Sequence, residues 1–387
     1  MTPAARVQAA IVILDDILSG TPVEKALTGW GRRSRFAGSK DRAAVRDNVF
    51  GVLRCKRSFG WLGGGDNGRS LMLGALRDAG TDPRILFDGV AHGPEVLSDD
   101  EALAGAALQD ATDPVRLDVP DWLWPDLQRS LGQQTESVLT LLRQRAPVHL
   151  RVNTRVTDRD ALLAELHRHG HDAHALAMTP TGVEVAGSPR GLVSLPCFEA
   201  GWFELQDGAS QAVVDRLSDH VKGAEVLDFC AGGGGKSLAM AAYAPKGLVA
   251  HDGAPERMSH LPERAGRAGV AIEVVSRVAG QFDLVLCDAP CSGSGAWRRQ
   301  PSSKWDLSAE RLKSLNDVQF GILSTAQGLV RPDGCLAYAT CSLLDTENDK
   351  IVERFLLAHP DWHSVDRMCL TPLDGGDGFY LNVLKRG

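Results

Sequence analysis

The distribution of hydrophobic and polar residues divides the chain into three regions. Within residues 1–135, apolar residues recur every three or four positions, notably in VQAAIVILDDIL and KDRAAVRDNVFGVLRC. This spacing predicts amphipathic helices. Stretches rich in glycine, such as GWGRR and WLGGGDNG, separate these segments. The pattern predicts that residues 1–135 form a separate, all-helical domain.

The pattern changes within residues 145–205. PVHLRVNT, GVEVAG and WFELQD are strand candidates, and DRDALLAELHRHG is an amphipathic helix candidate. We expect a small α/β subdomain here. The sequence HRHGHDAH raises the question of a metal site, but we interpret it as a polar helix end and turn.

Strand and helix patterns alternate from residue 206 to residue 387. The strand candidates are AEVLDF, GLVAHD, AIEVVS, FDLVLCD, CLAYATCS and GFYLNVLKR, and helix candidates such as LKSLNDVQFGILSTAQGLV lie between them. Alternation of this kind predicts a parallel sheet with helices on both faces. We therefore expect an α/β fold, with a doubly wound, Rossmann-like sheet in residues 206–387.

Composition narrows the class of protein. The 387 residues are 43% hydrophobic and 24% charged, which is typical of a soluble globular protein. No apolar run is long enough to span a membrane, and the N-terminus lacks the basic start of a signal peptide. The 8 cysteines form no C-x-x-C pair, which argues against disulfides and structural zinc. We expect a cytoplasmic monomer without a metal.

Charge is unevenly distributed along the chain. The net charge of −7 argues against a nucleic acid partner, yet basic residues dominate between Arg32 and Arg77. A local basic patch on an acidic protein can bind phosphates. A solvated helix face is the alternative explanation. The candidates for RNA contacts in this region are Arg32, Arg33 and Arg35.

A glycine-rich turn in VLDFCAGGGGKSLAMAA, residues 226–242, indicates a nucleotide or nucleoside site. A P-loop would need glycine where the chain has Cys230, and a dinucleotide turn starting at Gly232 would need glycine at Ser237. A glycine turn still lets the backbone approach a nucleoside cofactor closely. Asp252, after the next strand, is placed to accept hydrogen bonds from ribose hydroxyls.

A nucleotide hydrolase remains a weaker alternative, because FDLVLCD ends in Asp288 much as a magnesium-binding strand would. Two cysteine motifs favour a different chemistry. Cys291, in DAPCSGSGAWRRQPSSKW, and Cys341, in YATCSLLDTEND, each follow a strand candidate. Ligands bind at the carboxyl ends of such strands. We expect both thiols, Asp288 and the nucleoside site to converge.

DAPCSGSG and ATCS, after a Gly-Gly-Lys turn, resemble the RNA cytosine-carbon-5 methyltransferases of the Sun/Fmu (RsmB-like) family over most of residues 145–387. Residues 1–135 resemble its NusB-like RNA-binding domain, and residues 145–205 an RRM-like subdomain. The resemblance implies S-adenosylmethionine as cofactor and RNA as substrate, with 16S rRNA ahead of tRNA. It also implies a covalent cysteine adduct at carbon 6 of the cytosine.

The resemblance assigns roles to the site residues. Cys341 is the expected nucleophile, and Cys291 assists proton removal and release; the reverse assignment is the alternative, since DNA cytosine methyltransferases use the Pro-Cys cysteine. Asp288 would hydrogen-bond the base. Lys236 would lower the pKa of a thiol, or only order the glycine turn. The candidate cofactor residues are Asp228, Cys230, Ala231, Gly232, Gly233, Gly234, Gly235, Lys236, Asp252, Arg257, Ser276, Asp288 and Pro290.

Ser276 is a candidate because VVSRVAGQFD lacks the acidic residue that the family places after the third strand. Beyond Cys291, two tryptophans accompany basic residues that could hold phosphates, namely Arg298, Arg299 and Lys304. A solvated basic loop is the alternative. A non-catalytic RNA-binding or ribosome-assembly factor is a further alternative. The presence of both cysteines together with Asp288 favours an enzyme.

Overall fold

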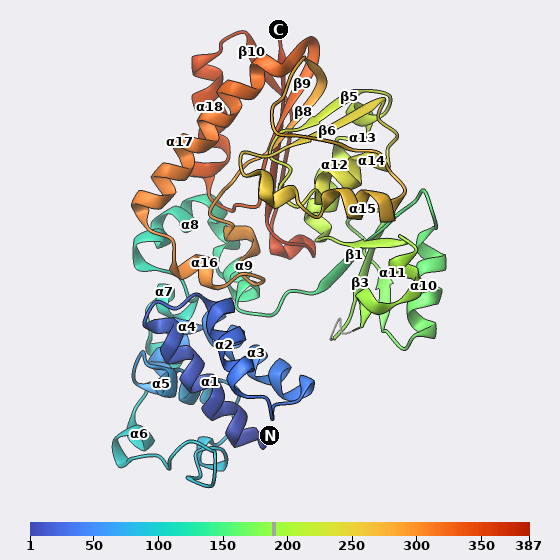
Figure 1. Cartoon of the computed structure of the whole chain (residues 1–387). Coiled ribbons are helices and arrows are strands. Elements are labelled where there is room, and N and C mark those ends of the chain that lie inside the picture. The colour runs from blue at the N-terminus through green and yellow to red at the C-terminus, as the bar shows by residue number, and fades with distance from the viewer. Residues whose placement is uncertain (188–190) are drawn as a thin grey trace. The chain divides into compact units, whose positions relative to one another are not determined.

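The computed structural model describes residues 1–187 and 191–387 (Figure 1). The chain forms two compact units. The helical unit comprises Met1–Gln128, Gly132–Arg145 and Trp297–Asp306, and the α/β unit comprises Arg129–Leu131, Ala146–Ala296 and Leu307–Gly387. Within the described residues, none of the helices combines the length and apolar character that crossing a membrane would require.

The N-terminal region is helical, as its periodicity predicts. Thr2 caps the first helix by accepting a hydrogen bond from the Ala5 backbone N–H, and proline occupies the first helical position. The helices are α1 (Pro3–Leu18), α2 (Val23–Arg33), α3 (Ser39–Arg54), α4 (Lys56–Gly63), α5 (Gly68–Asp78), α6 (Asp99–Leu103), α7 (Asp113–Arg116), α8 (Trp124–Leu131) and α9 (Thr135–Leu142).

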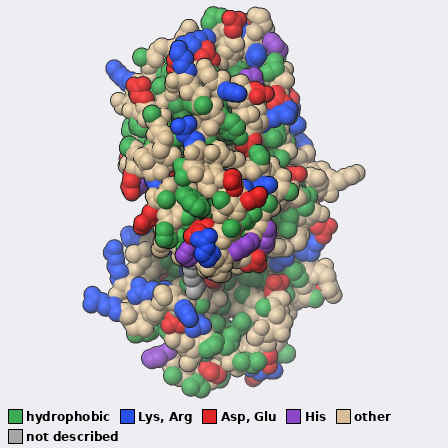
Figure 2. Space-filling view, turned by 90° about the vertical axis from the view of Figure 1, so that its right-hand side faces the viewer, with side chains coloured by type: hydrophobic (Ala, Val, Ile, Leu, Met, Phe, Trp, Pro, Cys, Tyr) green, Lys and Arg blue, Asp and Glu red, His purple; other side chains and the backbone are tan. Residues whose placement is uncertain are grey.

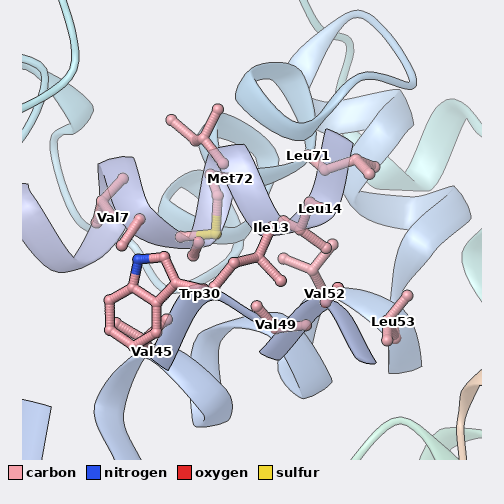
Figure 3. Close-up of a cluster of buried hydrophobic side chains, with 14 of the residues drawn as sticks. Val7, Ile13, Leu14, Trp30, Val45, Val49, Val52, Leu53, Leu71 and Met72 are labelled. Carbon is pink, nitrogen blue, oxygen red and sulfur yellow. The ribbon is translucent and has the colours of Figure 1, made fainter. Parts of the chain in front are cut away.

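The core of the helical unit collects the apolar faces of α1, α3 and α5 (Figure 3). Ile13 and Leu14 of α1 meet Val49 and Val52 of α3, and all four are buried. Helices α4 and α5 approach each other closely. A Cβ atom on Gly74 would lie 1.9 Å from the backbone oxygen of Phe59, so glycine is required there.

The helical unit also includes a short segment that lies more than 150 positions after its other residues in the sequence. We call Trp297–Asp306, which contains α16 (Ser302–Trp305), the strap. Lys304 Nζ donates to the Arg54 carbonyl at 3.0 Å, and Trp305 Nε1 donates to the Leu53 carbonyl at 2.6 Å. These carbonyls end α3 and have no partner within that helix. The strap therefore caps the C-terminus of α3.

A four-stranded antiparallel sheet begins the α/β unit, in the order β2-β3-β1-β4. Helix α10 (Arg159–Arg168) buries Leu162 and Leu166 in the core beneath it. The strands are β1 (Val148–Val152), β2 (Ala173–Ala175), β3 (Gly182–Val185) and β4 (Phe203–Leu205). His167 Nε2 lies 2.7 Å from the Ala173 carbonyl. No metal-binding cluster of His, Cys, Asp or Glu exists within residues 1–187 and 191–387.

A seven-stranded sheet, in the order β10-β11-β9-β8-β5-β6-β7, forms the centre of the described α/β unit (Figure 1). Strands β5 to β9 are parallel, whereas β10 and β11 are antiparallel to their neighbours. The strands are β5 (Glu225–Asp228), β6 (Gly247–His251), β7 (Glu273–Val275), β8 (Phe282–Asp288), β9 (Val330–Thr340), β10 (Trp362–Leu370) and β11 (Phe379–Arg386).

Helices cover both faces of this sheet. Successive residues of one strand point to opposite faces, so Val226 packs in the core under α12 and α14, whereas Leu227 packs in the core under α17 and α18. The helices are α12 (Gly208–Arg216), α13 (Ser218–Val221), α14 (Gly235–Ala241), α15 (Leu261–Ala268), α17 (Ala309–Ala326) and α18 (Asp349–Ala358). The doubly wound architecture expected from the alternation is confirmed.

The edge of the sheet differs from the expectation. Strand β10 was not predicted, because it is an exposed edge strand with one buried residue, Trp362, and lacks an apolar run. The sequence RPDG, which contains both Pro and Gly, lies inside β9. The segment APERMSHLPERAGRAG is α-helical only from Leu261, after a 3₁₀ turn at Pro255–Met258. Pro262 lies in the first turn of this helix, where its missing N–H is tolerated, whereas a helix that began further upstream would need that N–H for its hydrogen bonds.

Candidate active site

The glycine-rich turn joins the end of β5 to the start of α14. Gly232 and Gly234 have φ values of +53° and +77°, which favour glycine. A Cβ atom on Gly234 would lie 2.2 Å from the Leu261 side chain. Backbone conformation and close packing both explain why these positions are glycine. The turn leaves the backbone of Gly232–Gly235 at the carboxyl edge of the sheet.

Asp252 ties this turn to the end of β6. One carboxylate oxygen accepts a hydrogen bond from the Gly232 N–H at 2.7 Å, and the other accepts from the Ala254 N–H at 2.9 Å. Arg257 Nη1 lies 3.1 Å from the same carboxylate. The structure thus brings three predicted cofactor residues, Gly232, Asp252 and Arg257, into direct contact. Ser276 follows β7 directly, at the same edge of the sheet.

Asp228 is the most buried carboxylate of the predicted cofactor set. Its side chain is 1% exposed, and Ser237 Oγ donates to Oδ2 at 2.6 Å. Burial raises its pKa to about 7, against the ordinary value of 3.8. Oδ1 has no hydrogen-bond partner among the described residues. Cys230 follows two residues later, and burial raises the pKa of its thiol as well.

Lys236 and Asp288 form an ion pair at the carboxyl ends of β5 and β8. Lys236 Nζ donates to Asp288 Oδ2 at 2.7 Å and lies 4.4 Å from the ring centroid of Phe379. The lysine is 8% exposed. Its ammonium is therefore directed at Asp288. An effect of Lys236 on a thiol stays a prediction.

The two predicted cysteines meet at the same edge. Cys291 lies three residues beyond the end of β8, and Cys341 directly follows β9. These strands are parallel neighbours, with Asp288 aligned with Ala339. The two Sγ atoms are 3.5 Å apart. Adjacent parallel strands carry both motifs to one place, as the sequence predicts.

The two sulfur atoms occupy different environments. The hydrogen bond with Cys341 raises the pKa of the Cys291 thiol well above its usual range, and burial raises it further. Cys291 therefore retains its proton near neutral pH. Pro290, which precedes it, accepts a hydrogen bond at its carbonyl from Gln319 Nε2 at 3.0 Å.

Two of the three predicted RNA contacts after Cys291 are buried. Arg298 is 5% exposed and Lys304 is 2% exposed, while Arg299 is half-buried. Lys304 Nζ lies 4.6 Å from the ring centroid of Trp305, and burial lowers its pKa to about 8. The expectation of a phosphate-binding surface at Arg298 and Lys304 is corrected, because the strap uses this segment to cap α3.

The predicted RNA contacts near the N-terminus are exposed. Arg32, Arg33 and Arg35 lie at or just beyond the C-terminal end of α2. Arg33 Nη2 lies 3.9 Å from Asp16 Oδ2. In the part of the chain that the structure describes, no ion pair involves Arg32 or Arg35. On the face drawn in Figure 2, basic and acidic side chains are intermixed.

The sequence analysis did not select Glu347. This residue lies six positions after Cys341, within the motif YATCSLLDTEND, and is 0% exposed. Its carboxylate contacts the residue following each cysteine, Ser292 and Ser342. An acidic residue so close to a nucleophile candidate was the available signal, but its burial depends on the tertiary fold.

Known proteins match most of this chain. Residues 217–380 match the family described as 16S rRNA methyltransferase RsmB/F, and residues 119–190 match the ferredoxin-like domain described as RsmF/B-like. A methyltransferase homolog protein from Pyrococcus horikoshii has a similar fold, with a TM-score of 0.62 and 21% identity, over 75% of this chain and 100% of that one.

Two curated relatives are both named ribosomal RNA small subunit methyltransferase B. The protein from Photorhabdus laumondii is 32% identical, over 69% of this chain and 66% of its own length, so the chain spans about two thirds of that relative. The protein from Cronobacter sakazakii is 31% identical, over 90% of this chain and 91% of its own length. Because the Cronobacter relative is 31% identical over most of both chains, and the RsmB/F model matches the residues that hold both cysteines, the chain belongs to the RsmB/F family of 16S rRNA methyltransferases.

Proposed function

We propose that this protein transfers a methyl group from S-adenosylmethionine to carbon 5 of a cytosine in RNA, in the first place in 16S rRNA. The observation that carries the proposal is the 3.5 Å separation of the Cys291 and Cys341 sulfur atoms. Both lie at the sheet edge that also holds Asp288 and the glycine turn. Family membership supports RNA as the substrate.

The residues around the glycine turn fit this cofactor. Asp228 Oδ1 is a buried acceptor without a partner among the described residues, and it suits an ammonium or hydroxyl donor. The turn at Gly232 allows the backbone to approach a nucleoside closely. Asp252 stands where ribose hydroxyls are bound in related sheets. When bound, the cofactor supplies an electrophilic methyl group on its sulfonium centre.

The side chains provide what the cytosine needs. Carbon 5 of the ring is a weak nucleophile, and a thiolate that adds to carbon 6 makes it strongly nucleophilic. After methylation, carbon 5 still holds a proton, which a base must remove before the carbon–sulfur bond breaks and the thiolate leaves. Asp288, at the same edge, is placed to accept a hydrogen bond from the exocyclic amine.

We assign these steps to the two cysteines as the family resemblance implies, and the difference between the two thiols supports the assignment. Cys291 retains its proton because its hydrogen bond with Cys341 and its burial both raise its pKa. We propose that Cys341 is the nucleophile that adds to carbon 6. Cys291 takes the second role, and it accepts the proton from carbon 5 once its own thiol proton has passed to solvent. The target base must leave its stack to reach this buried edge.

Trapping of the covalent adduct tests this assignment. Cys291→Ala should accumulate a protein–RNA complex that survives denaturation, because the adduct forms but cannot be resolved. Cys341→Ala should form none. Cys369→Ala, at an exposed cysteine of β10, is the matched control. Adducts from Cys341→Ala would reverse the roles, and tight RNA binding without any methyl transfer by the unmodified protein would favour a non-catalytic factor.

The choice between RNA classes is tested separately. We expect methylation of 16S rRNA lacking this modification and little methylation of bulk tRNA. Methyl transfer to tRNA alone would mean that the substrate is tRNA instead of 16S rRNA, with the proposed chemistry at cytosine unchanged.

A further inference from the structure

Glu347 is a buried carboxylate within reach of both cysteine motifs. It ends the 3₁₀ turn at Asp345–Glu347 and is 0% exposed. A carboxylate removed from water needs hydrogen-bond donors on both oxygens. The identity of those donors reveals what the residue does.

Two of the donors to Glu347 belong to Ser292, in the loop that carries Cys291. The Ser292 backbone N–H donates to Glu347 Oε1 at 2.8 Å, and the Ser292 hydroxyl donates to Oε2. Gln319 Nε2 donates to Oε1 at 3.0 Å and also to the Pro290 carbonyl at 3.0 Å. Cys291 is therefore flanked on both sides by residues held in this network.

The loop that carries Cys341 supplies the remaining donor. The Ser342 hydroxyl donates to Glu347 Oε2 at 2.5 Å. Tyr338, inside β9, donates through its hydroxyl to the Glu347 carbonyl at 2.6 Å. A backbone contact joins the loops directly, since the Gly295 N–H donates to the Cys341 carbonyl at 3.0 Å. Glu347 is thus the side chain that bonds the residue following each cysteine.

We propose that Glu347 is a positioning residue, which holds the Cys291 and Cys341 loops in register so that both sulfur atoms reach one pyrimidine ring. The part of this proposal that concerns the pyrimidine rests on the proposed function. Every side-chain hydrogen bond described for Glu347 is donated to the carboxylate. Only an ionised acid accepts all four without reversing a donor.

The negative charge of Glu347 also affects the pKa of the Cys291 thiol. The pKa of Cys291 is raised first by its hydrogen bond with Cys341 and then by burial, and the Glu347 carboxylate raises it further. A buried negative charge at this position therefore favours the protonated form of the Cys291 thiol.

Three variants separate position from charge. Glu347→Ala removes all four acceptor contacts. Glu347→Gln keeps one oxygen for Ser292 and Gln319 but removes the charge. Glu353→Gln, on the exposed side of α18, is the matched control, because Glu353 contacts only the exposed Lys350 among its described partners.

For Glu347→Ala we expect kcat for methyl transfer to fall about 100-fold, the effect of misplacing reacting groups by about 1 Å. The KM for S-adenosylmethionine should stay within about twofold, because the glycine turn lies on another strand. Glu347→Gln should lose less, about tenfold. A Glu347→Ala enzyme with an unchanged kcat, or with a raised KM as its main defect, would overturn the proposal.

A second experiment tests the positions of the two sulfur atoms without requiring methyl transfer. Diamide oxidises two thiols to a disulfide and takes up both hydrogen atoms. The rate of Cys291–Cys341 disulfide formation, compared between variants at equal thiolate fraction, therefore reports the sulfur separation. Sulfur atoms 3.5 Å apart need only a small movement to bond. Peptide mass spectrometry should show fast cross-linking in the unmodified protein and Glu353→Gln, and cross-linking at least tenfold slower in Glu347→Ala.

The two readouts distinguish the possible failures. If the unmodified protein cross-links rapidly but methylates no cytosine, the proposed function fails and the positioning role stands. If Glu347→Ala cross-links as fast as the unmodified protein, the positioning role fails whatever the activity. If Glu347→Ala does not fold, the variant Gln319→Met tests the proposal instead. It removes the amide group that donates to Glu347 and to the Pro290 carbonyl, and it should slow cross-linking about threefold. An unchanged rate would overturn the proposal.

Discussion

Replacement of Asp228 by Asn removes a buried charge next to the glycine turn. The side chain is 1% exposed, and its pKa of about 7 lies above the ordinary 3.8 because burial disfavours the carboxylate. That rise corresponds to about 4 kcal/mol of unfavourable free energy in the folded state above pH 7. Asn avoids this cost, and the pKa of about 7 already includes the favourable effect of the Ser237 hydrogen bond on the carboxylate. We expect Asp228→Asn to be more stable at pH 7.5 by up to about 4 kcal/mol.

The pH dependence has a definite sign. The folded pKa of Asp228 is raised, so the unfolded chain releases this proton first, and the stability contributed by the group falls as the pH rises from about 4 to about 7. The advantage of Asp228→Asn should therefore grow across that window and level off above pH 7. Guanidinium unfolding at several pH values measures it. Asp219→Asn, at an exposed position of α13, is the control.

The same variant should bind S-adenosylmethionine at least about tenfold more weakly by calorimetry, since a neutral amide replaces the acceptor proposed for the cofactor. Gain in stability with loss of cofactor affinity is the expected combination. A variant less stable than the unmodified protein at pH 7.5, or a stability difference that does not change with pH, would refute the reasoning about the buried charge. Unchanged affinity would refute the cofactor role.

Three further predictions concern the glycine turn, the strap and the exposed arginines. Gly234→Ala should weaken S-adenosylmethionine binding more than tenfold by calorimetry, because its Cβ would clash with Leu261 at 2.2 Å. Trp305→Phe should lower the stability of the helical unit by about 1 kcal/mol in thermal unfolding but leave RNA affinity intact, because its N–H caps α3. Neutral substitution of a set of exposed arginines should weaken RNA binding in filter assays and reduce its salt dependence, with no effect on cofactor affinity; the set is Arg32, Arg33 and Arg35.

The alternation of strand and helix patterns predicted the sheet and the meeting of the cysteines. This inference succeeds because parallel neighbouring strands must deliver their carboxyl ends to one edge. Cys291 and Cys341 are 50 positions apart in the chain, yet their sulfur atoms lie 3.5 Å apart. The pairing of Lys236 with Asp288 was missed, because two side chains from different strand ends give no periodic signal.

The strap shows the limit of reasoning from local composition. Arg298 and Lys304 sit in a basic, tryptophan-containing segment, a pattern typical of nucleic acid contacts. The ammonium of Lys304 binds the carbonyl of Arg54 at the end of α3, 250 positions earlier in the chain. Glu347 is a similar case, since only the folded loops surround its carboxylate with donors. Tertiary partners, rather than sequence neighbours, decide such positions.

The central claim is that methyl transfer occurs at carbon 5 of cytosine. RNA labelled with tritium at carbon 5 of its cytosines measures this directly, because the hydrogen at carbon 5 must leave when the methyl group enters. With unmodified 16S rRNA and S-adenosylmethionine, the account predicts one tritium released to water for each methyl group incorporated. Methyl incorporation with the tritium fully retained in the RNA would contradict it.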